Sequence, residues 1–179
     1  MASHRVSLQM FLVAMVLTGC GSDSTVEPQS EESVDLDQST KIDAAYCKIS
    51  GVTIGSKYRD VVTAFDATDD DFSQISGGEQ TPVKFFEGRG VFAVLIEDVV
   101  TAVGSETPDH GIANSLYPDA SRDAVVSTLG ETVGTSGDNL EVLSYWCRDF
   151  EPTGERVMMA IRVIRGRVES ISIVSGDVD

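Results

Sequence analysis

The strongest structural signal in this chain is the stretch VMMAIRVIRGRVESISIV, residues 157–174. Its first half places an apolar side chain at every second position, at Val157, Met159, Ile161 and Val163. After an Arg-Gly turn, Ile171 and Ile173 alternate with serines in the same way. A period of two is typical of a β-strand that buries one face and exposes the other. The stretch therefore predicts an antiparallel hairpin in a half-buried sheet.

A weak internal repeat extends this prediction to the rest of the domain. The apolar residues at positions 61, 62 and 65 recur 64 positions later at 125, 126 and 129. Further along, Val100 and Val168 occupy like places 68 positions apart. Such self-similarity is typical of a fold built from copies of one supersecondary unit. We therefore expect two units, of which the second is slightly longer.

Each unit is expected to begin with a helix and to continue as strands. In the first unit, Tyr58 completes an apolar helical stripe that Ser56 can cap. In the second, Asp119 or Ser121 can cap the helix and Gly130 can end it. Strand-like runs follow at 83–86, 90–96 and 99–103, and again at 141–147, 157–164 and 167–174. The pattern predicts an α+β fold in which two tandem helix-plus-antiparallel-meander units form one curved sheet with the helices on one face.

The N-terminal region carries an export signal. After a weakly basic start, an apolar run ends in Leu17-Thr18-Gly19-Cys20, which resembles the lipobox of bacterial lipoproteins. Residues 1–19 are then a cleaved signal peptide, and Cys20 is the lipidation site that anchors the protein to a membrane. The alternatives are an uncleaved spanning helix, which needs about 20 apolar residues, and a plain secretory signal. Gly21, rather than Asp, at the next position favours the outer membrane of a double-membraned host.

An acidic segment separates Cys20 from the repeat. Residues 21–45 carry seven acidic side chains against the single Lys41, with hardly any large apolar ones. Such a composition cannot bury enough apolar surface to fold, so residues 20–45 are expected to form an extended, disordered tether. The two α+β units then occupy residues 46–108 and 109–179.

The charge of the chain excludes one class of partner. The sequence has 29 acidic and 13 basic residues, a net charge of −16 and a pI near 4.3. Binding to nucleic acid depends on neutralising phosphates with Lys and Arg. Nucleic acid is therefore not an expected partner.

Two cysteines remain once Cys20 is lipidated. Cys47 and Cys147 are 100 positions apart, and an even number of cysteines in an exported chain favours a disulfide. In the chain-entropy model, a loop of this length gives about 4 to 5 kcal/mol of stability. The alternative is a pair of buried thiols, because the sequence alone does not show that the two positions meet.

The second unit carries a family resemblance. Its motifs are Asp119–Val126, Leu129-Gly130, Leu143–Trp146, Ala160–Val163 and Gly166–Ile171. They resemble the module shared by the SmpA/OmlA (BamE-like) outer-membrane assembly lipoproteins and the tandem-repeat β-lactamase inhibitory proteins. The first half is similar but degenerate, and the resemblance spans about residues 50–175. It departs from the family where Phe65-Asp66 stands in place of Leu-Gly and where Glu131 follows Gly130.

Catalytic chemistry finds little support in the sequence. His110 is the only histidine after the signal peptide, and the spacing motifs of serine hydrolases, redox dithiols and zinc proteases are missing. The aspartates at positions 66, 69, 70 and 71 lack EF-hand spacing, which favours a solvated loop over a calcium site. We therefore expect no metal, no cofactor and no enzyme activity. The alternative is a small carboxylate-dependent envelope hydrolase, since many acidic residues could supply a catalytic pair.

One strand face of the second unit is a better candidate for function. Trp146 has the parity opposite to Leu143 and Tyr145, so it faces away from the core if those two face the helices. Arg148 and Arg162 are expected beside it, and Trp and Arg are enriched at binding hot spots. The alternative is a buried Trp146, with the arginines paired to nearby glutamates on a solvated face.

These patterns together predict a lipid-anchored envelope protein that acts as a protein–protein interaction module. Its expected partners are the membrane, through the lipid anchor, and an envelope or secreted protein attracted by the local positive charge. The resemblance implies an assembly accessory on the BamE-like side and an enzyme inhibitor on the β-lactamase-inhibitor side. The predicted partner-binding residues are Trp146, Arg148 and Arg162.

Overall fold

The computed structural model of the protein describes residues 39–75, 83–113, 116–132, 134–137, 139–148 and 156–175. The predicted signal peptide, the predicted lipidation site Cys20 and most of the predicted tether lie outside these residues. Within them, no helix is long and apolar enough to cross a membrane.

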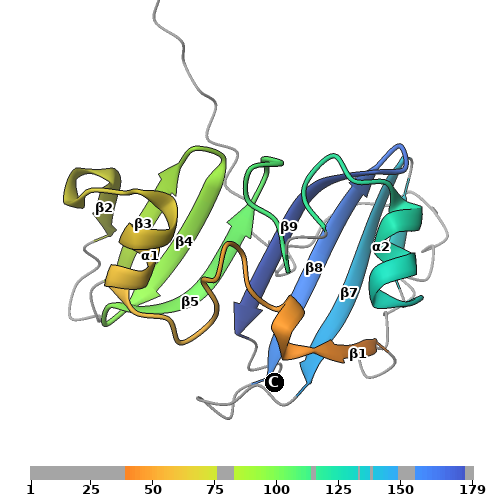
Figure 1. Cartoon of the computed structure of the whole chain (residues 1–179), viewed down its shortest axis with the longest axis horizontal. Coiled ribbons are helices and arrows are strands. Elements are labelled where there is room, and N and C mark those ends of the chain that lie inside the picture. The colour runs from red at the N-terminus through yellow and green to blue at the C-terminus, as the bar shows by residue number, and fades with distance from the viewer. Residues whose placement is uncertain are drawn as a thin grey trace, which may run out of the picture. The chain divides into compact units, whose positions relative to one another are not determined.

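The described residues form one mixed sheet of nine strands and two short α-helices (Figure 1). The sheet order is β1-β7-β8-β9-β5-β4-β3-β2, and β6 also pairs with β7. The pairing of β1 with β7 is parallel and the other pairings are antiparallel. The strands are β1 (Thr40–Asp43), β2 (Phe72–Ile75), β3 (Val83–Gly88), β4 (Val91–Ile96), β5 (Val99–Ser105), β6 (Gly134–Gly137), β7 (Leu140–Arg148), β8 (Val157–Ile164) and β9 (Arg167–Ser175). The helices are α1 (Tyr58–Phe65) and α2 (Arg122–Leu129), and the 3₁₀ turns are η2 (Ala44–Tyr46) and η3 (Asp69–Asp71).

The predicted α+β class was wrong, because the sheet dominates the fold. Each α-helix has only eight residues, whereas nine strands pair in one sheet instead of the six predicted. The three additional strands, β1, β2 and β6, have four residues each and lie where the sequence predicts a tether or polar loops. The sequence GTSG of β6 has no apolar alternation at all. Such short edge strands form because a neighbouring strand offers free backbone groups, rather than through their own propensity.

The internal repeat is confirmed by matching backbone hydrogen bonds. In the first unit, the N–H of Gly55 donates to the carbonyl of Val100 at 2.9 Å. In the second unit, the N–H of Asp119, 64 positions after Gly55, donates to the carbonyl of Val168, 68 positions after Val100, at 2.7 Å. Both units also have a register shift at the same place, where their last two strands pair. Each unit is thus one helix followed by four strands rather than by the predicted three.

The two units join through their last strands. In the antiparallel pair of β5 with β9, Val103 lies opposite Ile173 and Ser105 lies opposite Ile171. Equivalent residues of these two strands are 68 positions apart, so Val103 is equivalent to Ile171 and Ser105 to Ile173. An approximate two-fold axis between Gly104 and Ser172 therefore relates the two pairs. The sheet is therefore continuous from one unit to the other.

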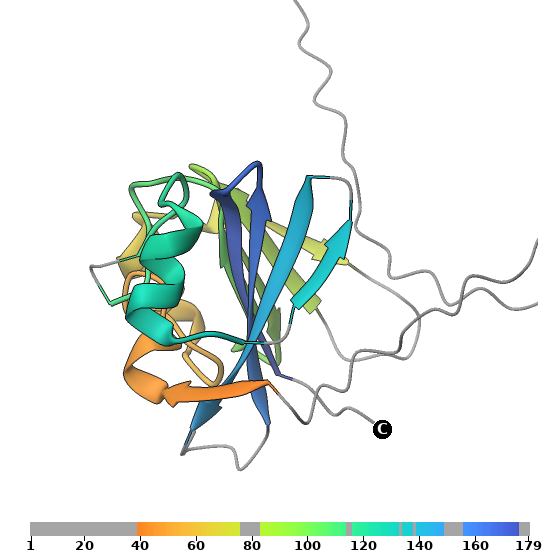
Figure 2. The ribbon, with the colours of Figure 1, turned by 90° about the vertical axis from the view of Figure 1, so that its right-hand side faces the viewer.

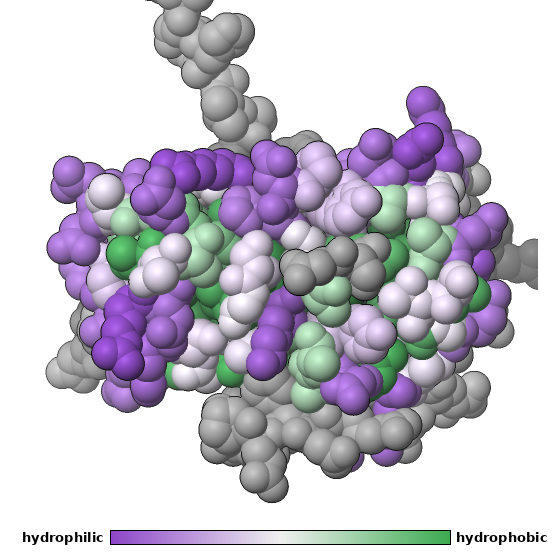
Figure 3. All heavy atoms as spheres, in the orientation of Figure 1, coloured by the Kyte–Doolittle hydropathy of each residue, from purple (hydrophilic) through white to green (hydrophobic). Residues whose placement is uncertain are grey.

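Both helices lie on the same face of the sheet (Figure 2). Their side chains Val61, Phe65, Val125 and Leu129 are buried against the strands. The strands contribute every second residue to this core, as the strict alternation of buried and half-buried side chains in β8 shows. Seen from the helix side, hydrophilic side chains surround smaller apolar areas (Figure 3).

The outer edge of β7 is closed by two short strands and a disulfide. β6 pairs with the first half of β7, and β1 pairs with its second half, where the Ile42 side chain is only 5% exposed. The predicted boundary at residue 46 was therefore wrong, since β1 and η2 already belong to the folded domain. Cys47 and Cys147 are bonded, with Cα atoms 6.2 Å apart, which confirms the predicted disulfide.

Tyr145 links the sheet to the end of α2. Its side chain is fully buried, and its hydroxyl donates a 2.9 Å hydrogen bond to the carbonyl of Gly130. Burial, together with the charge of Glu131, raises the pKa of Tyr145 to about 12. The unfolded value lies near 10, so the folded chain holds this proton more tightly. The resulting stability is complete below about pH 10 and is lost as the pH rises towards about 12.

We expect Tyr145→Phe to lower the free energy of unfolding by about 1 kcal/mol at neutral pH, because the Gly130 carbonyl loses its partner. The difference between the two proteins should shrink above about pH 10, since only the original chain has the tyrosine to deprotonate. Urea unfolding of both proteins at about pH 7 and about pH 11 measures this. A difference that stays constant across this range contradicts the assignment.

Candidate functional site on the open face of the sheet

The candidate functional site is the face of the sheet on which neither of the two described helices lies, which we call the open face. In an antiparallel sheet with one covered face, the other face is normally polar. Here the half-buried positions that alternate with the core are largely apolar. On β3, β4, β7, β8 and β9 they include Phe85, Phe92, Val94, Val142, Trp146, Met158, Ala160 and Val174, and the exposed Ile96 ends β4 on the same face.

Phe92 lies near the centre of the open face. A side-chain carbon added at Gly104 would come within 2.1 Å of the Phe92 ring, so the ring lies directly over β5 at this glycine. Gly104 is also next to the approximate two-fold axis, opposite Ser172. In the second unit, Ala160 takes the place of Phe92. The aromatic half of the open face therefore belongs to the first unit.

Trp146 lies on the open face near the other end of the sheet. It is in register with Lys41 on β1 and with Met158 on β8, and Tyr145 beside it faces the core. Its side chain is half-buried rather than exposed. The alternation in the sequence thus indicates the face on which Trp146 lies, and its role in binding stays a prediction.

Arg162, one of the two predicted arginines, lies apart from Trp146 along the sheet. Arg162 lies on the same face, but it pairs in register with Val142, four residues along β8 from Met158. That separation is about 13 Å. The Arg162 Nε lies 2.7 Å from the Glu169 carboxylate, so its charge is largely compensated. Arg148 ends β7, and its side chain lies outside the described residues.

Sequence reasoning missed the aromatic part of the open face. Its strands were predicted, but β4 reads VFAVLI, which is apolar at every position. Such a run is typical of a strand with two apolar faces. This signal could have identified Phe92 and Val94 as members of a second apolar surface.

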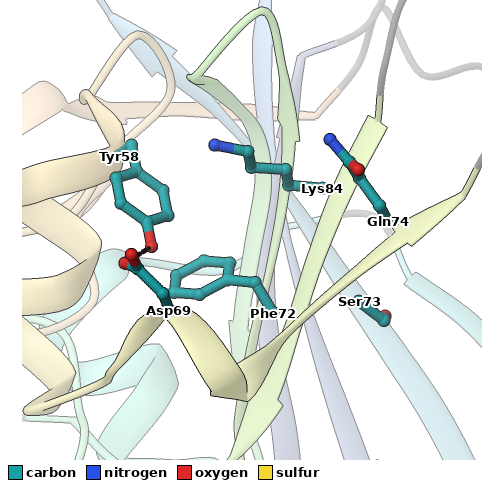
Figure 4. A pocket seen from close by; sticks show the side chains of 6 residues that line it. All are labelled: Tyr58, Asp69, Phe72, Ser73, Gln74 and Lys84. Atoms are coloured by element: carbon teal, nitrogen blue, oxygen red, sulfur yellow. Dashed lines mark hydrogen bonds between the residues drawn. The ribbon is translucent and has the colours of Figure 1, made fainter.

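A pocket of about 290 Å³ lies at the β2 edge of the sheet (Figure 4). The Tyr58 hydroxyl donates to an Asp69 carboxylate oxygen at 2.5 Å, and this hydrogen bond raises the pKa of Tyr58 to about 12. The Lys84 ammonium lies 4.3 Å from the centre of the Tyr58 ring and 2.6 Å from the Asp98 carboxylate. The lining residues are Tyr58, Asp69, Phe72, Ser73, Gln74 and Lys84.

Three of the four aspartates near this pocket have partners within the protein, beginning with Asp69 and its hydrogen bond from Tyr58. Asp66 pairs with Arg89 at 3.1 Å. Asp71 accepts hydrogen bonds from the N–H and hydroxyl of Thr68, which lower the pKa of its carboxyl. Among the described residues, no group of three or more His, Cys, Asp or Glu side chains is placed to hold a metal ion.

His110 has a local structural environment. Its Nδ1 lies 2.9 Å from the Ser50 hydroxyl, and its ring packs edge-on against Phe65 with centroids 5.3 Å apart. These contacts hold the loop between the two units against the first unit. The expectation that the protein is not an enzyme, and the hydrolase alternative, both stay untested predictions.

Comparisons with known proteins give few matches. No protein-family model matches the chain, and no curated protein matches it. Two solved structures are similar at low sequence identity. One is an extracellular protein containing an SCP domain from Bacillus anthracis, with a TM-score of 0.42 and 8% identity over 87% of this chain. This chain spans only 50% of that protein's length.

The other solved structure is a candidate β-lactamase inhibitor protein from Streptococcus mutans. It has a TM-score of 0.28 and 12% identity, over 70% of this chain and 85% of that one. It is on the inhibitor side of the resemblance seen in the sequence, and neither solved structure is described as an assembly lipoprotein. At these scores the likenesses carry no argument about function.

Proposed function

We propose that this protein is a lipid-anchored binding module of the cell envelope, and that its open face binds another protein. The observation that carries the proposal is the apolar character of a sheet face that no helix covers. Contiguous apolar surface of this kind on a soluble domain marks an interaction site. Phe92 and Trp146 supply aromatic side chains of the type that dominates binding energy.

The size of the open face is adequate for a stable complex. Eight strands lie side by side in the sheet. At a spacing of about 4.8 Å they span about 34 Å, and strands of about six residues are about 20 Å long. The face thus offers on the order of 700 Å². A standard protein–protein interface buries roughly 800 Å² of each partner, so one partner can cover most of the open face.

The anchor and the location complete the proposal. Leu17-Thr18-Gly19-Cys20 supports lipidation at Cys20, and Gly21 supports retention at the outer membrane. A partner would then be another envelope or secreted protein. The role is that of an enzyme inhibitor or of an assembly accessory, and the identity of the partner decides between them.

We expect Cys20→Ser to release the protein from the membrane, because the thiol that receives the lipid is lost. Fractionation of cells after a high-salt wash measures this. The variant should be recovered in the soluble fraction, whereas the original chain should sediment with membranes. A variant that still sediments places the anchor elsewhere.

Crosslinking from defined positions tests the binding function. A photoreactive amino acid in place of Phe92 should capture a partner in cells, because this position lies near the centre of the open face. The matched control is Arg59 on α1, whose side chain is 89% exposed on the helix side. Equal capture from both positions, or capture from Arg59 alone, contradicts the proposal. An enzyme in the crosslink supports the inhibitor role, and a membrane-assembly component supports the accessory role.

We expect Trp146→Ala to weaken partner binding by about 2 kcal/mol or more, as truncation of a hot-spot residue does. Its half-buried side chain should contribute less to stability than a core residue, about 1 to 2 kcal/mol. Thermal unfolding and titration with the captured partner measure the two quantities. A stability loss of about 3 to 5 kcal/mol with unchanged binding contradicts the prediction and indicates that Trp146 has a purely structural role.

A further inference from the structure

Short strands form the edge of the sheet at both ends. At one end, β6 and β1 each pair with β7 and are the outermost strands. At the other end, β2 is the last strand, and among the described residues it pairs only with β3. The outward N–H and C=O groups of such an edge are a template for another extended chain. The free edge of β2 is therefore a place where a peptide strand can add.

The pocket beside β2 is a departure from the internal repeat. By register, Tyr58 and Lys84 in the first unit correspond to Arg122 and Glu141 in the second. There the Arg122 guanidinium makes two hydrogen bonds to the Glu141 carboxylate, at 2.8 and 3.0 Å, so the two side chains lie against each other. In the first unit, the Lys84 ammonium lies over the Tyr58 ring, 4.3 Å from its centre, in place of this ion pair. The rings of Tyr58 and Phe72 pack with centroids 4.6 Å apart and form an apolar wall beside the open pocket.

The charge beside this edge is mostly negative, and the nearby cation Arg89 pairs with Asp66. The 3₁₀ turn η3 consists of Asp69, Asp70 and Asp71 and leads directly into β2. Asp69 and Asp71 accept hydrogen bonds from neutral groups of Tyr58 and Thr68. Asp70 makes no side-chain hydrogen bond or ion pair with any described residue. The nearest lysine, Lys84, is already paired with Asp98. A ligand with positive charge is therefore favoured at this end of β2.

We infer that β2 is a docking edge for an extended, basic segment of a partner protein. The segment adds to the sheet as a strand beside Phe72–Ile75, places an apolar or aromatic side chain in the pocket against Tyr58 and Phe72, and sets a lysine or arginine against η3. Backbone pairing supplies affinity and the pocket supplies specificity in this mode of recognition. The surface is separate from the open face and does not depend on the function proposed there.

Three synthetic peptides test the inference on the full-length protein kept in mild detergent. The first, Lys-Thr-Val-Phe-Val-Thr-Lys, is basic at both ends and has a central run of β-branched and aromatic residues that favour a strand. The second replaces both lysines with glutamates, and the third replaces both valines with prolines, which prevents strand pairing. In an NMR titration, only the first should shift the amide signals of β2 and β3 strongly at up to about 5 mM. Failure of the first peptide to bind overturns the inference.

The other outcomes separate the parts of the argument. Equal binding of the glutamate peptide overturns the charge argument, and equal binding of the proline peptide overturns strand addition. Shifts confined to β7, β8 and β9 place the peptide on the open face and also overturn it. None of these results affects the crosslinking test at Phe92.

A pair of matched variants locates the site. Gln74 is exposed and lines the pocket, so Gln74→Lys should weaken binding of the basic peptide by roughly fivefold through like-charge repulsion. Ser136 occupies the corresponding register position on β6 and is also exposed. Ser136→Lys should leave binding unchanged. Equal effects of the two substitutions overturn the assignment to β2, and unchanged thermal unfolding of both shows that the fold is intact.

Discussion

Removal of the Cys47–Cys147 disulfide, by Cys47→Ala together with Cys147→Ala, is expected to lower the free energy of unfolding by about 4 to 5 kcal/mol. The bond closes a loop of 100 positions, and its absence gives the unfolded chain much more conformational freedom. A domain of this size has a total stability of only about 5 to 15 kcal/mol. The variant should therefore be close to unfolding under ordinary conditions.

The position of the bond adds a structural consequence. Cys47 is fully buried and follows η2, so the bond ties β1 and its neighbouring turn to β7. Without it, β1 is held to β7 by one short parallel pairing. Urea unfolding of the variant, and of the original chain with and without reductant, measures the effect. A loss below about 1 kcal/mol in both comparisons contradicts the prediction and indicates that β1 and the core hold the segment without the bond.

Three of the four strands of the second unit could be predicted from the sequence to within one residue. The predicted runs 157–164 and 167–174 correspond to Val157–Ile164 and Arg167–Ser175. They were predictable because a strand with one buried face has an apolar residue at every second position of its sequence. The helix at Tyr58–Phe65 was predictable for the same reason, from its apolar stripe. Local periodicity is thus sufficient where an element buries its own apolar side.

The short edge strands could not be predicted, and the fold class was wrong as a result. β6 and β1 pair with β7 through backbone groups, and β1 lies in an acidic segment with only Ile42 buried. Nothing in the four residues of such a strand distinguishes it from a loop. Its existence depends on the free edge of a partner that is distant in sequence.

The candidate site could be predicted in one respect only. Parity alone indicates the face on which Trp146 lies, but the compensation of Arg162 depends on Glu169 at the register shift between β8 and β9. The contact of Phe92 with Gly104 likewise depends on how β4 and β5 align. Side-chain contacts across strands follow from register, which a single sequence does not specify without its turns and pairing.

Phe65 is a core residue at which the two units of the repeat differ, so the second unit supplies a natural comparison for it. Its side chain is 1% exposed, stacks on Phe86 with centroids 5.7 Å apart and meets the His110 ring edge-on. The equivalent residue in the second unit is Leu129, which is also buried. Asp66 after Phe65 and Gly130 after Leu129 both have positive φ, at 48° and 90°, but their ψ values of 44° and 168° differ, so the chain leaves the two helices in different conformations.

We expect Phe65→Ala to lower the free energy of unfolding by about 3 to 5 kcal/mol, because it removes a ring from a closely packed aromatic cluster and leaves a cavity. Phe65→Leu places the second unit's residue in the first unit and should cost less than about 1.5 kcal/mol, since the smaller side chain keeps most of the apolar contact. Urea unfolding of both variants measures the difference. If Phe65→Leu lowers the free energy of unfolding as much as Phe65→Ala does, the aromatic ring itself is required. The core of the first unit then depends on an aromatic side chain at a position where the second unit packs a leucine.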